Sequence, residues 1–334
     1  MERLQDRVAV VTGAGSGIGL ASVRRLAAEG AKIVAVDINE PAGQAAAAQT
    51  DGIFLAADVA REDQVRHLYE EVAARFGRVD IAFNNAGISP PEDDSILTTG
   101  LEAWRRVQEI NLTSVYLCCK YALPHMQRQG KGSIINTASF VAVLGAATSQ
   151  ISYTASKGGV LAMSRELGVQ FAREGVRVNA LCPGPVNTPL LRELFAADPE
   201  RAARRLVHVP LGRFAEPAEI AAAVAFLASD DASFITASSF LVDGGIAGAY
   251  VTPLLRQGQP GGGCGELLGV RQRQAGGLVS REWLPPGDRH QLLQRAGPLG
   301  TLGHSRDGAA APLRRPGGRG RRNSHPAAAG LRRP

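Results

Sequence analysis

Short apolar runs alternate with stretches of helical periodicity over the first 250 residues. Val8–Thr12 is apolar up to its last residue, which is typical of a strand buried on both faces of a parallel sheet. Leu20–Glu29 places apolar residues on one side of a helix and ends before a glycine. Further strands are expected at 32–36, 80–83, 133–138 and 240–243, with a helical stretch at 102–126. This alternation predicts an α/β fold with a single doubly wound parallel sheet and helices on both faces.

A glycine-rich turn separates the first strand from the first helix. Gly13-Ala-Gly-Ser-Gly17-Ile-Gly19 follows the strand at once. Glycines let the backbone approach a pyrophosphate, which then lies against the positive end of a helix. The spacing is T-G-x-x-x-G-x-G, because Ile18 holds the last position of the commoner G-x-G-x-x-G pattern. This context favours a Rossmann-type dinucleotide site, and a tight turn without a ligand is the alternative.

The residue that ends the second strand bears on the choice of dinucleotide. A carboxylate at Asp37 can accept hydrogen bonds from both hydroxyls of an adenosine ribose and would repel a 2′-phosphate. Ile38 and Asn39 follow it, and Ser16 occupies the glycine turn where a basic residue would help to bind phosphate. We therefore expect NAD rather than NADP, and a solvated acid at a strand end is the alternative interpretation.

Tyr153 and Lys157 are separated by one helical turn, so a phenol and an ammonium would point to one side of a helix. A nearby cation favours the phenolate and lowers the tyrosine pKa from its ordinary value of about 10. Such a tyrosine would suit proton transfer near neutral pH. Taken alone, the pair is weak evidence, because most Tyr-x-x-x-Lys pairs are accidents of the surface.

Further polar motifs follow the predicted strands in order: Asp58-Val59, Asn84-Asn85-Ala86-Gly87, Asn111, Ser139, Tyr153, Lys157 and Pro183-Gly184-Pro185-Val186-Asn187-Thr188. With the glycine turn, this order and spacing resemble the classical short-chain dehydrogenase/reductase family from about Leu4 to Pro253. The same region is similar to the bacterial enzymes known as 3-oxoacyl-acyl-carrier-protein reductases. Each motif is unspecific by itself, but the combination is highly specific.

The resemblance implies a catalytic tetrad of Asn111, Ser139, Tyr153 and Lys157. In this family the tyrosine exchanges a proton with the substrate oxygen, and the serine hydrogen-bonds the same oxygen. The lysine binds the nicotinamide ribose, and the asparagine holds a water that relays protons. The hydride chemistry itself belongs to the cofactor.

The expected ligand contacts fall into two sets. The cofactor set is Gly13, Ser16, Gly17, Ile18, Gly19, Asp37, Asp58, Val59, Asn85, Ala86, Gly87, Tyr153, Lys157, Pro183, Gly184, Val186 and Thr188. The substrate set is Ser139, Val141, Gln150, Tyr153 and Pro185. No metal ligands are expected, since the cysteines and histidines lack metal-ligand spacing.

The segment 190–213 corresponds to the part of the family that covers the substrate. It is expected to be a helical insertion, and it carries Arg201, Arg204 and Arg205. These arginines would either contact an anionic substrate or carrier, or form a solvated helix face, which is the favoured interpretation. The resemblance also implies a homotetramer.

Several features bear on the surroundings of the protein. No run of eighteen apolar residues exists, so a membrane span is not expected. The N-terminal residues lack the shape of a signal peptide. The four cysteines suggest no disulfide framework, and Cys118 and Cys119 suit buried packing on an apolar helix. A reducing cytoplasm is the expected location.

The chain changes character after Pro253, so we expect a catalytic domain over 1–253 and a low-complexity tail over 254–334. Residues 256–334 hold 14 Arg against 4 acidic residues, a net charge of +10, and no Lys, Ile, Phe, Tyr or Met. The whole chain carries +6, which leaves −4 for residues 1–255. This composition builds no core and predicts disorder.

Arginine without lysine, beside many Gly, Ala and Pro, is what GC-rich DNA encodes in an unselected frame. We therefore hypothesise that a frameshift near codon 255 replaced a short native terminus, which resequencing of the locus would decide. An Arg/Gly-rich tail that binds nucleic acid is the less favoured alternative, because Trp283 is its only aromatic residue.

Three functions compete at this point. The leading prediction is an NAD-dependent oxidoreductase that acts on a secondary alcohol or ketone, with Tyr153 as general acid and base. The alternative within enzymes is an NADPH-dependent reductase of 3-oxoacyl thioesters carried on acyl-carrier protein or coenzyme A. The alternative outside enzymes is a cofactor-sensing or scaffold protein, which is expected to have lost a catalytic residue, and none of the four is missing.

Overall fold

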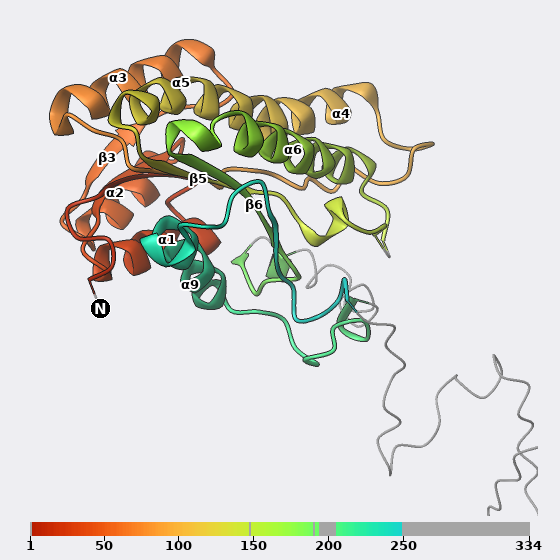
Figure 1. The fold of residues 1–334 in the computed structure, drawn as a ribbon. Coiled ribbons are helices and arrows are strands. Elements are labelled where there is room, and N and C mark those ends of the chain that lie inside the picture. Colours follow the sequence, from red (N-terminus) through yellow and green to blue (C-terminus); the bar gives the residue numbers. More distant parts are fainter. Residues whose placement is uncertain (1, 147, 190, 194–204, 249–334) are drawn as a thin grey trace, which may run out of the picture. The chain divides into compact units, whose positions relative to one another are not determined.

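The computed structural model describes residues 2–146, 148–189, 191–193 and 205–248 (Figure 1). Within them, parallel strands form one sheet in the order β3-β2-β1-β4-β5-β6-β7. The strands are β1 (Val8–Thr12), β2 (Lys32–Asp37), β3 (Ile53–Ala56), β4 (Ile81–Asn84), β5 (Gly132–Thr137), β6 (Val176–Pro183) and β7 (Ser239–Val242). The predicted doubly wound α/β fold is therefore confirmed.

Helices cover both faces of the sheet (Figure 1). One layer holds α3 (Glu62–Phe76), α4 (Leu101–Gln108), α5 (Ser114–Gln129) and α6 (Ile151–Gln170). The other layer holds α1 (Gly17–Ala28), α2 (Glu40–Ala48) and α9 (Pro217–Ala228). Short helices η1 (Glu109–Thr113), η2 (Phe140–Ala142), η3 (Ala172–Glu174) and η4 (Asp230–Ala232) connect or extend these elements. No helix among the described residues is long and apolar enough to cross a membrane.

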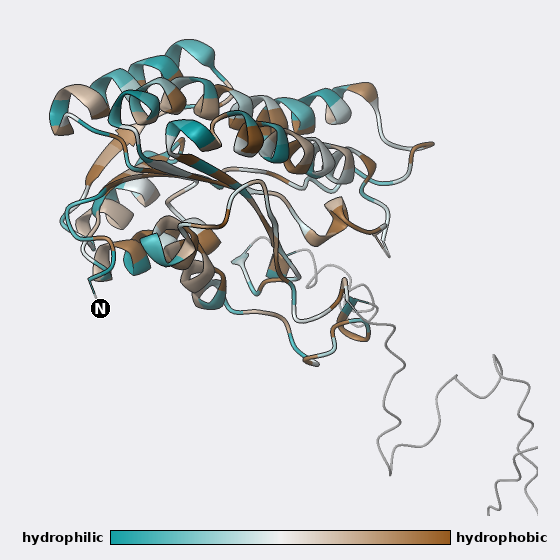
Figure 2. Cartoon of the chain, in the orientation of Figure 1, coloured by the Kyte–Doolittle hydropathy of each residue, from teal (hydrophilic) through white to brown (hydrophobic). Residues whose placement is uncertain are grey.

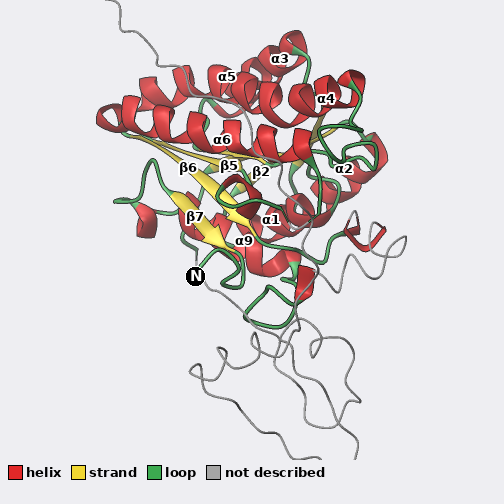
Figure 3. Cartoon of the chain, turned by 90° about the vertical axis from the view of Figure 1, so that its right-hand side faces the viewer, coloured by secondary structure: helices red, strands yellow, loops and turns green. Residues whose placement is uncertain are grey.

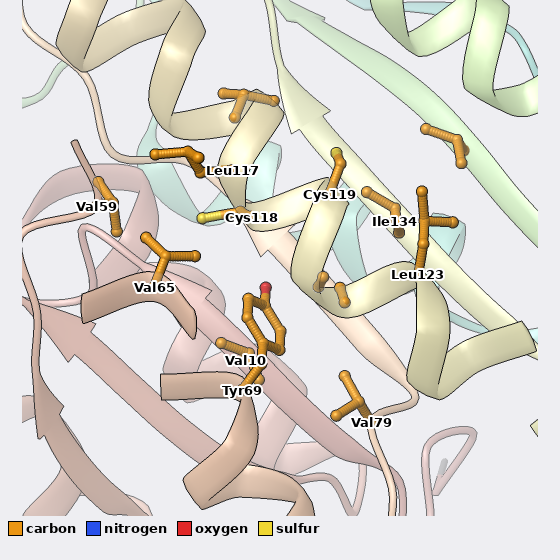
Figure 4. Close-up of a cluster of buried hydrophobic side chains, with 14 of the residues drawn as sticks. Val10, Val59, Val65, Tyr69, Val79, Leu117, Cys118, Cys119, Leu123 and Ile134 are labelled. Atoms are coloured by element: carbon orange, nitrogen blue, oxygen red, sulfur yellow. The ribbon is translucent and has the colours of Figure 1, made fainter. Parts of the chain in front are cut away.

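The alternation of side chains along each strand divides the core into two clusters. Val8 and Val10 of β1 pack on the side of α3, α5 and α6, whereas Ala9 and Val11 pack on the side of α1 and α9. Because both faces are covered, every residue of β1 and β5 is buried, and hydrophilic residues gather on the outer faces of the helices (Figure 2). In the first cluster, Tyr69 of α3 lies beside Cys118 of α5 (Figure 4).

The position of the site follows from the strand order. β1 pairs with β2 on one side and with β4 on the other, so the connections leave the sheet in opposite directions at this point. The loops after β1 and β4 therefore diverge at the carboxyl ends of the strands and leave a crevice there. Figure 3 shows the sheet from the side of β6 and β7, with α6 along one face.

Two sequence-based boundaries differ from the structure. The first helix begins at Gly17 rather than Leu20, because Ser16 is its N-cap residue and the carbonyl of Ser16 accepts the backbone N–H of Leu20. The helical stretch expected over 102–126 is divided into α4, the π-helix η1 and α5. A π-turn inserts one residue into the helical repeat, and such insertions are frequent at functional sites.

Two other expectations fall mostly or wholly outside the described part of the chain. The helical insertion over 190–213 lies largely there, including Arg201 and Arg204, and the low-complexity tail over 254–334 lies wholly there. The tail and its proposed origin therefore stay predictions.

Candidate active site

A pocket lies at the carboxyl ends of β1, β4, β5 and β6, beside the first turn of α6. Its lining joins segments that are far apart in the sequence. The predicted residues that line it are Gly13, Ser16, Gly17, Ile18, Asn85, Ala86, Gly87, Ser139, Gln150, Tyr153, Lys157, Pro183, Gly184, Pro185, Val186 and Thr188. Gly19, Asp37, Asp58, Val59, Asn111 and Val141 are not among the lining residues.

The glycine turn forms one end of the pocket and leaves no room for larger residues. Gly13 and Gly17 adopt positive φ values of 65° and 52°, which L-residues with a Cβ rarely adopt. A Cβ added to Gly19 would lie 1.9 Å from the carbonyl oxygen of Gly13. The turn therefore packs directly on the start of α1, and the helix N-terminus faces the pocket as a dinucleotide phosphate requires.

Asp37 stands behind this turn at the end of β2. Its Oδ2 accepts the backbone N–H of Gly15 at 2.8 Å, and its Oδ1 accepts that of Asn39 at 2.9 Å. Asp58 and Val59 follow β3 nearby in the sheet, and the Asp58 carboxylate accepts the N–H of Ala60 at 3.0 Å. Asp37, the acid expected to contact the adenosine ribose, is thus hydrogen-bonded to the glycine turn itself.

Lys157 is a buried charged group of the site, with 3% of its surface exposed. Its Nζ donates a hydrogen bond to the carbonyl oxygen of Thr137 at 2.7 Å and lies 5.6 Å from the centre of the Tyr153 ring. Burial lowers the pKa of Lys157 to about 8. The amine is therefore poised to lose its proton at a moderately alkaline pH.

Tyr153 lies on the first turn of α6, on the same side as Lys157. Burial raises the pKa of its phenol above the ordinary value, while Ser139 and the positive charge of Arg205 act in the opposite direction. The sequence-based expectation that Lys157 holds the tyrosine pKa low is therefore wrong for the structure as it stands. Desolvation outweighs the nearby charges.

Asn111 lies behind the pocket, fully buried in the π-helix η1. Its Oδ1 accepts the N–H of Ile88 at 2.7 Å, and its Nδ2 donates to the carbonyl of Ile88 at 2.8 Å. A Cβ added to Gly87 would lie 3.1 Å from Asn111 Oδ1 and 3.5 Å from Lys157 Nζ. Asn111 and Lys157 thus approach each other at Gly87, which has no side chain to separate them.

Val141 is buried and its backbone N–H lies 3.4 Å from the Ser139 hydroxyl oxygen, which accepts it. It follows that this valine orients the serine through the backbone rather than lining the pocket. Among the residues of the substrate set, Ser139, Gln150, Tyr153 and Pro185 do line it.

The structure overturns the favoured interpretation of Arg205 and adds Asp93, which the sequence did not single out. Arg205 lines the pocket, so its interpretation as part of a solvated helix face is wrong. Asp93 is buried, and its carboxylate accepts the backbone N–H groups of Ser152 and Tyr153 at 2.8 and 2.7 Å. Arg205 and Asp93 are placed by contacts with residues more than fifty positions away in the sequence, and no local motif encodes such contacts.

Three features together define a nicotinamide-dependent oxidoreductase. They are the strand order, the glycine turn at the point where the strand order reverses, and the pocket lining that contains Ser139, Tyr153 and Lys157. Comparison with known proteins agrees with this. The profile of a family described as enoyl-(acyl carrier protein) reductase matches residues 13–247. The chain belongs to the short-chain dehydrogenase/reductase family and is an oxidoreductase.

Three relatives illustrate the similarity. Cis-4-hydroxycyclohexanecarboxylate dehydrogenase of Sinomonas cyclohexanicum is 44% identical over 248 residues, which are 73% of this chain and 98% of that protein. Meso-2,3-butanediol dehydrogenase of Serratia marcescens is 40% identical over 246 residues, or 73% and 95%. The crystal structure of levodione reductase superposes with a TM-score of 0.69 at 39% identity, covering 74% of this chain and all of that one.

Proposed function

We propose that this enzyme is an NAD-dependent dehydrogenase of secondary alcohols, with Tyr153 as the general acid and base. One observation carries the proposal. Ser139, Tyr153 and Lys157 line a single pocket that begins at the glycine turn. The names of the relatives, which refer to a hydroxycyclohexane acid and a butanediol, support a substrate with a secondary hydroxyl group.

The residues present fit a nicotinamide dinucleotide. The turn at Gly13–Gly19 would hold the pyrophosphate, Asp37 the adenosine ribose, and Val186 and Thr188 the carboxamide and phosphates. Asp58, Val59 and Asn85 would line the adenosine end. When bound, the nicotinamide supplies the hydride acceptor, and everything else in the reaction is proton transfer and positioning by the protein.

In the direction of alcohol oxidation, Tyr153 in its phenolate form would take the proton of the substrate hydroxyl as the carbonyl forms. Ser139 would donate a hydrogen bond to the same oxygen and so hold the substrate in position. Lys157 would bind the nicotinamide ribose and hold it beside Tyr153. Asn111, which reaches Gly87 beside Lys157, would connect the lysine to a water chain.

Asp37 supports NAD over NADP, because a 2′-phosphate would meet a carboxylate already held by the Gly15 and Asn39 amides. The alternative of an NADPH-dependent reductase of 3-oxoacyl thioesters requires that phosphate. The same assay therefore separates the two functions.

The test is a dehydrogenase screen of the full-length protein with NAD and NADP on cyclohexanol, meso-2,3-butanediol and a 3-oxoacyl thioester. We expect turnover of the alcohols with NAD. Tyr153→Phe should lower kcat by roughly 100- to 10,000-fold and leave NADH binding intact. Tyr121→Phe is the control, since the Tyr121 hydroxyl bonds Glu62 outside the pocket. Unchanged activity in Tyr153→Phe would remove the catalytic assignment.

We further propose that four copies associate through α5, α6 and β7, and that the enzyme works in the cytoplasm. Tyr116 of α5, Val169 of α6 and Leu241 of β7 are large exposed side chains. Nothing within 4 Å would meet a Cβ added to Gly158 on α6, so a neighbouring helix has room to approach there. Light scattering after gel filtration tests the tetramer.

A further inference from the structure

Gln150 stands at the start of the catalytic helix, but its side chain does not cap that helix. It is the N-cap residue of α6, and Tyr153 follows three residues later. An N-cap side chain ordinarily accepts a free amide of the first turn. The Gln150 side chain makes no such bond. The carboxylate of Asp93 takes the N–H groups of Ser152 and Tyr153 instead, which leaves the glutamine side chain available for another role.

The orientation of the Gln150 amide is fixed by Arg205. Arg205 Nη2 donates to Gln150 Oε1 at 3.0 Å and to Thr148 Oγ1 at 2.8 Å. A guanidinium has only N–H donors, so the amide must turn its oxygen toward Arg205 and its nitrogen away from it. Arg205 is thus engaged by side chains of the protein itself, and its effect here is to orient the glutamine.

The amide nitrogen of Gln150 has no hydrogen-bond partner within the described part of the chain. Gln150 is 8% exposed and lines the pocket together with Ser139 and Tyr153. An amide withdrawn from water with unused donors costs free energy unless an acceptor reaches it. Because the residue lines the pocket, a molecule bound there can supply that acceptor.

The composition of the pocket lining makes such a donor selective. The lining includes the apolar side chains of Ile88, Phe140 and Leu191. Under the proposed function, Ser139 and Tyr153 are already assigned to the oxygen that reacts. A buried N–H donor discriminates strongly between ligands, because a ligand without a matching acceptor leaves it unpaired.

We propose that the Gln150 amide nitrogen donates a hydrogen bond to a second oxygen of the substrate, so that the enzyme selects alcohols and ketones that carry another hydroxyl or carbonyl group. This inference rests on the proposed function and names the substrate class of that site. Gln150 is a specificity-determining residue in this arrangement, whereas Ser139 and Tyr153 act on the oxygen that reacts.

The test measures ketone reduction with NADH by the full-length protein on two pairs of ketones. Each pair consists of a two-oxygen ketone and a matching monoketone: methoxyacetone with 2-pentanone, and 1,4-cyclohexanedione with cyclohexanone. The second oxygen of methoxyacetone or of the dione only accepts hydrogen bonds, so it probes the Gln150 donor. Gln150→Glu keeps an oxygen for Arg205 and replaces the N–H donor by a second acceptor. We expect the ratio of kcat/KM between the two-oxygen ketone and its monoketone to fall by ~10- to 100-fold in at least one pair.

Thr148→Val is the matched control, because it removes the other acceptor of Arg205 and leaves the Gln150 amide in place. Its ratios should equal those of the wild-type protein. An effect of the new carboxylate on Tyr153 changes both ketones of a pair alike, so it does not alter the ratio. Unchanged ratios in Gln150→Glu for both pairs, or the same fall in Thr148→Val, would overturn the proposal.

A binding measurement separates this inference from the proposed function. NAD⁺ cannot reduce a ketone, so either two-oxygen ketone can be added with NAD⁺ to form an unreactive complex. At least one of them should raise the Tm of the wild-type protein and of Thr148→Val more than that of Gln150→Glu. An equal rise in all three proteins would contradict the role of Gln150. A wild-type protein that binds a two-oxygen ketone through Gln150, but reduces no ketone and oxidises no alcohol, would sink the proposed function and keep the second-oxygen site.

Discussion

The carboxylate of Asp93 caps the helix that carries Tyr153. Its two oxygens accept the backbone N–H groups of Ser152 and Tyr153 at 2.8 and 2.7 Å, and the carbonyl of Asp94 accepts the N–H of Ile151 at 3.1 Å. The first turn of a helix has N–H groups without partners inside the helix. Here an acid from the loop after β4 satisfies them, which fixes the start of α6 against the segment that carries Gly87.

Asp93→Ala should therefore destabilise the protein and impair catalysis together. The loss of a helix cap costs about 0.5–2 kcal/mol, and buried N–H groups left unpaired add to it. Because the cap sets the position of Tyr153, we expect kcat to fall while the Kd for NADH is retained. Chemical denaturation and steady-state kinetics measure the two effects.

The neighbouring acid and a conservative change provide the controls for this prediction. Asp93→Asn keeps one accepting oxygen and should recover part of kcat, whereas Asp94→Ala, at an exposed position, should leave kcat near the wild-type value. If Asp93→Ala lost stability with full kcat in the folded protein, the residue would have a structural role alone.

Replacement of Asp37 should change the choice of cofactor. Without its carboxylate the ribose loses two hydrogen-bond acceptors and a 2′-phosphate loses a repelling charge. We expect the wild-type enzyme to prefer NAD over NADP by at least about tenfold, and Asp37→Ser to reduce this ratio. The ratio of kcat/KM for the two cofactors is the measurement. Glu40→Gln, an exposed change nearby on α2, should leave the ratio unaltered.

The buried Lys157 should make the stability depend on pH in a defined window. Its pKa is about 8 in the folded protein and near 10.5 when unperturbed. Between these values the unfolded chain binds more protons, so the free energy of unfolding contributed by this group rises with pH. The wild-type protein should gain up to about 3 kcal/mol relative to Lys157→Met between about pH 8 and pH 10.5.

Denaturation curves of both proteins at several pH values across this window give the difference directly, because all other groups are shared. Lys131→Met controls for the loss of a lysine at the surface, where Lys131 pairs with Asp230. A difference between wild type and Lys157→Met that stays constant with pH would contradict the prediction.

Tyr69→Phe should be neutral or stabilising. The Tyr69 hydroxyl is buried among Val10, Val65 and Cys118 without a hydrogen-bond partner (Figure 4). Burial of such a group costs about 1–3 kcal/mol, which phenylalanine avoids while keeping the ring in place. Thermal unfolding measures the gain. Tyr121→Phe, which loses a bond to Glu62, should bring none.

Much of the fold and part of the site are local in origin, and the sequence alone determined them. The apolar run Val8–Thr12, the glycine turn and the helix after it form a continuous segment, so its pattern predicts its structure. The same holds for Tyr153 and Lys157, which a single helical turn places on one side. Helical and strand periodicities need no partner to be recognised.

The tertiary structure decided what depends on distant contacts and on burial. Arg205 reaches the pocket because Gln150, 55 residues away, receives it, and Asp93 caps a helix that starts 58 residues later. The π-turn at Asn111 interrupts a pattern that reads as one helix. The pKa of Tyr153 is raised because its surroundings exclude water, an effect that the spacing to Lys157 does not reveal. Desolvation is set by everything that packs around a group, so only the folded chain determines it.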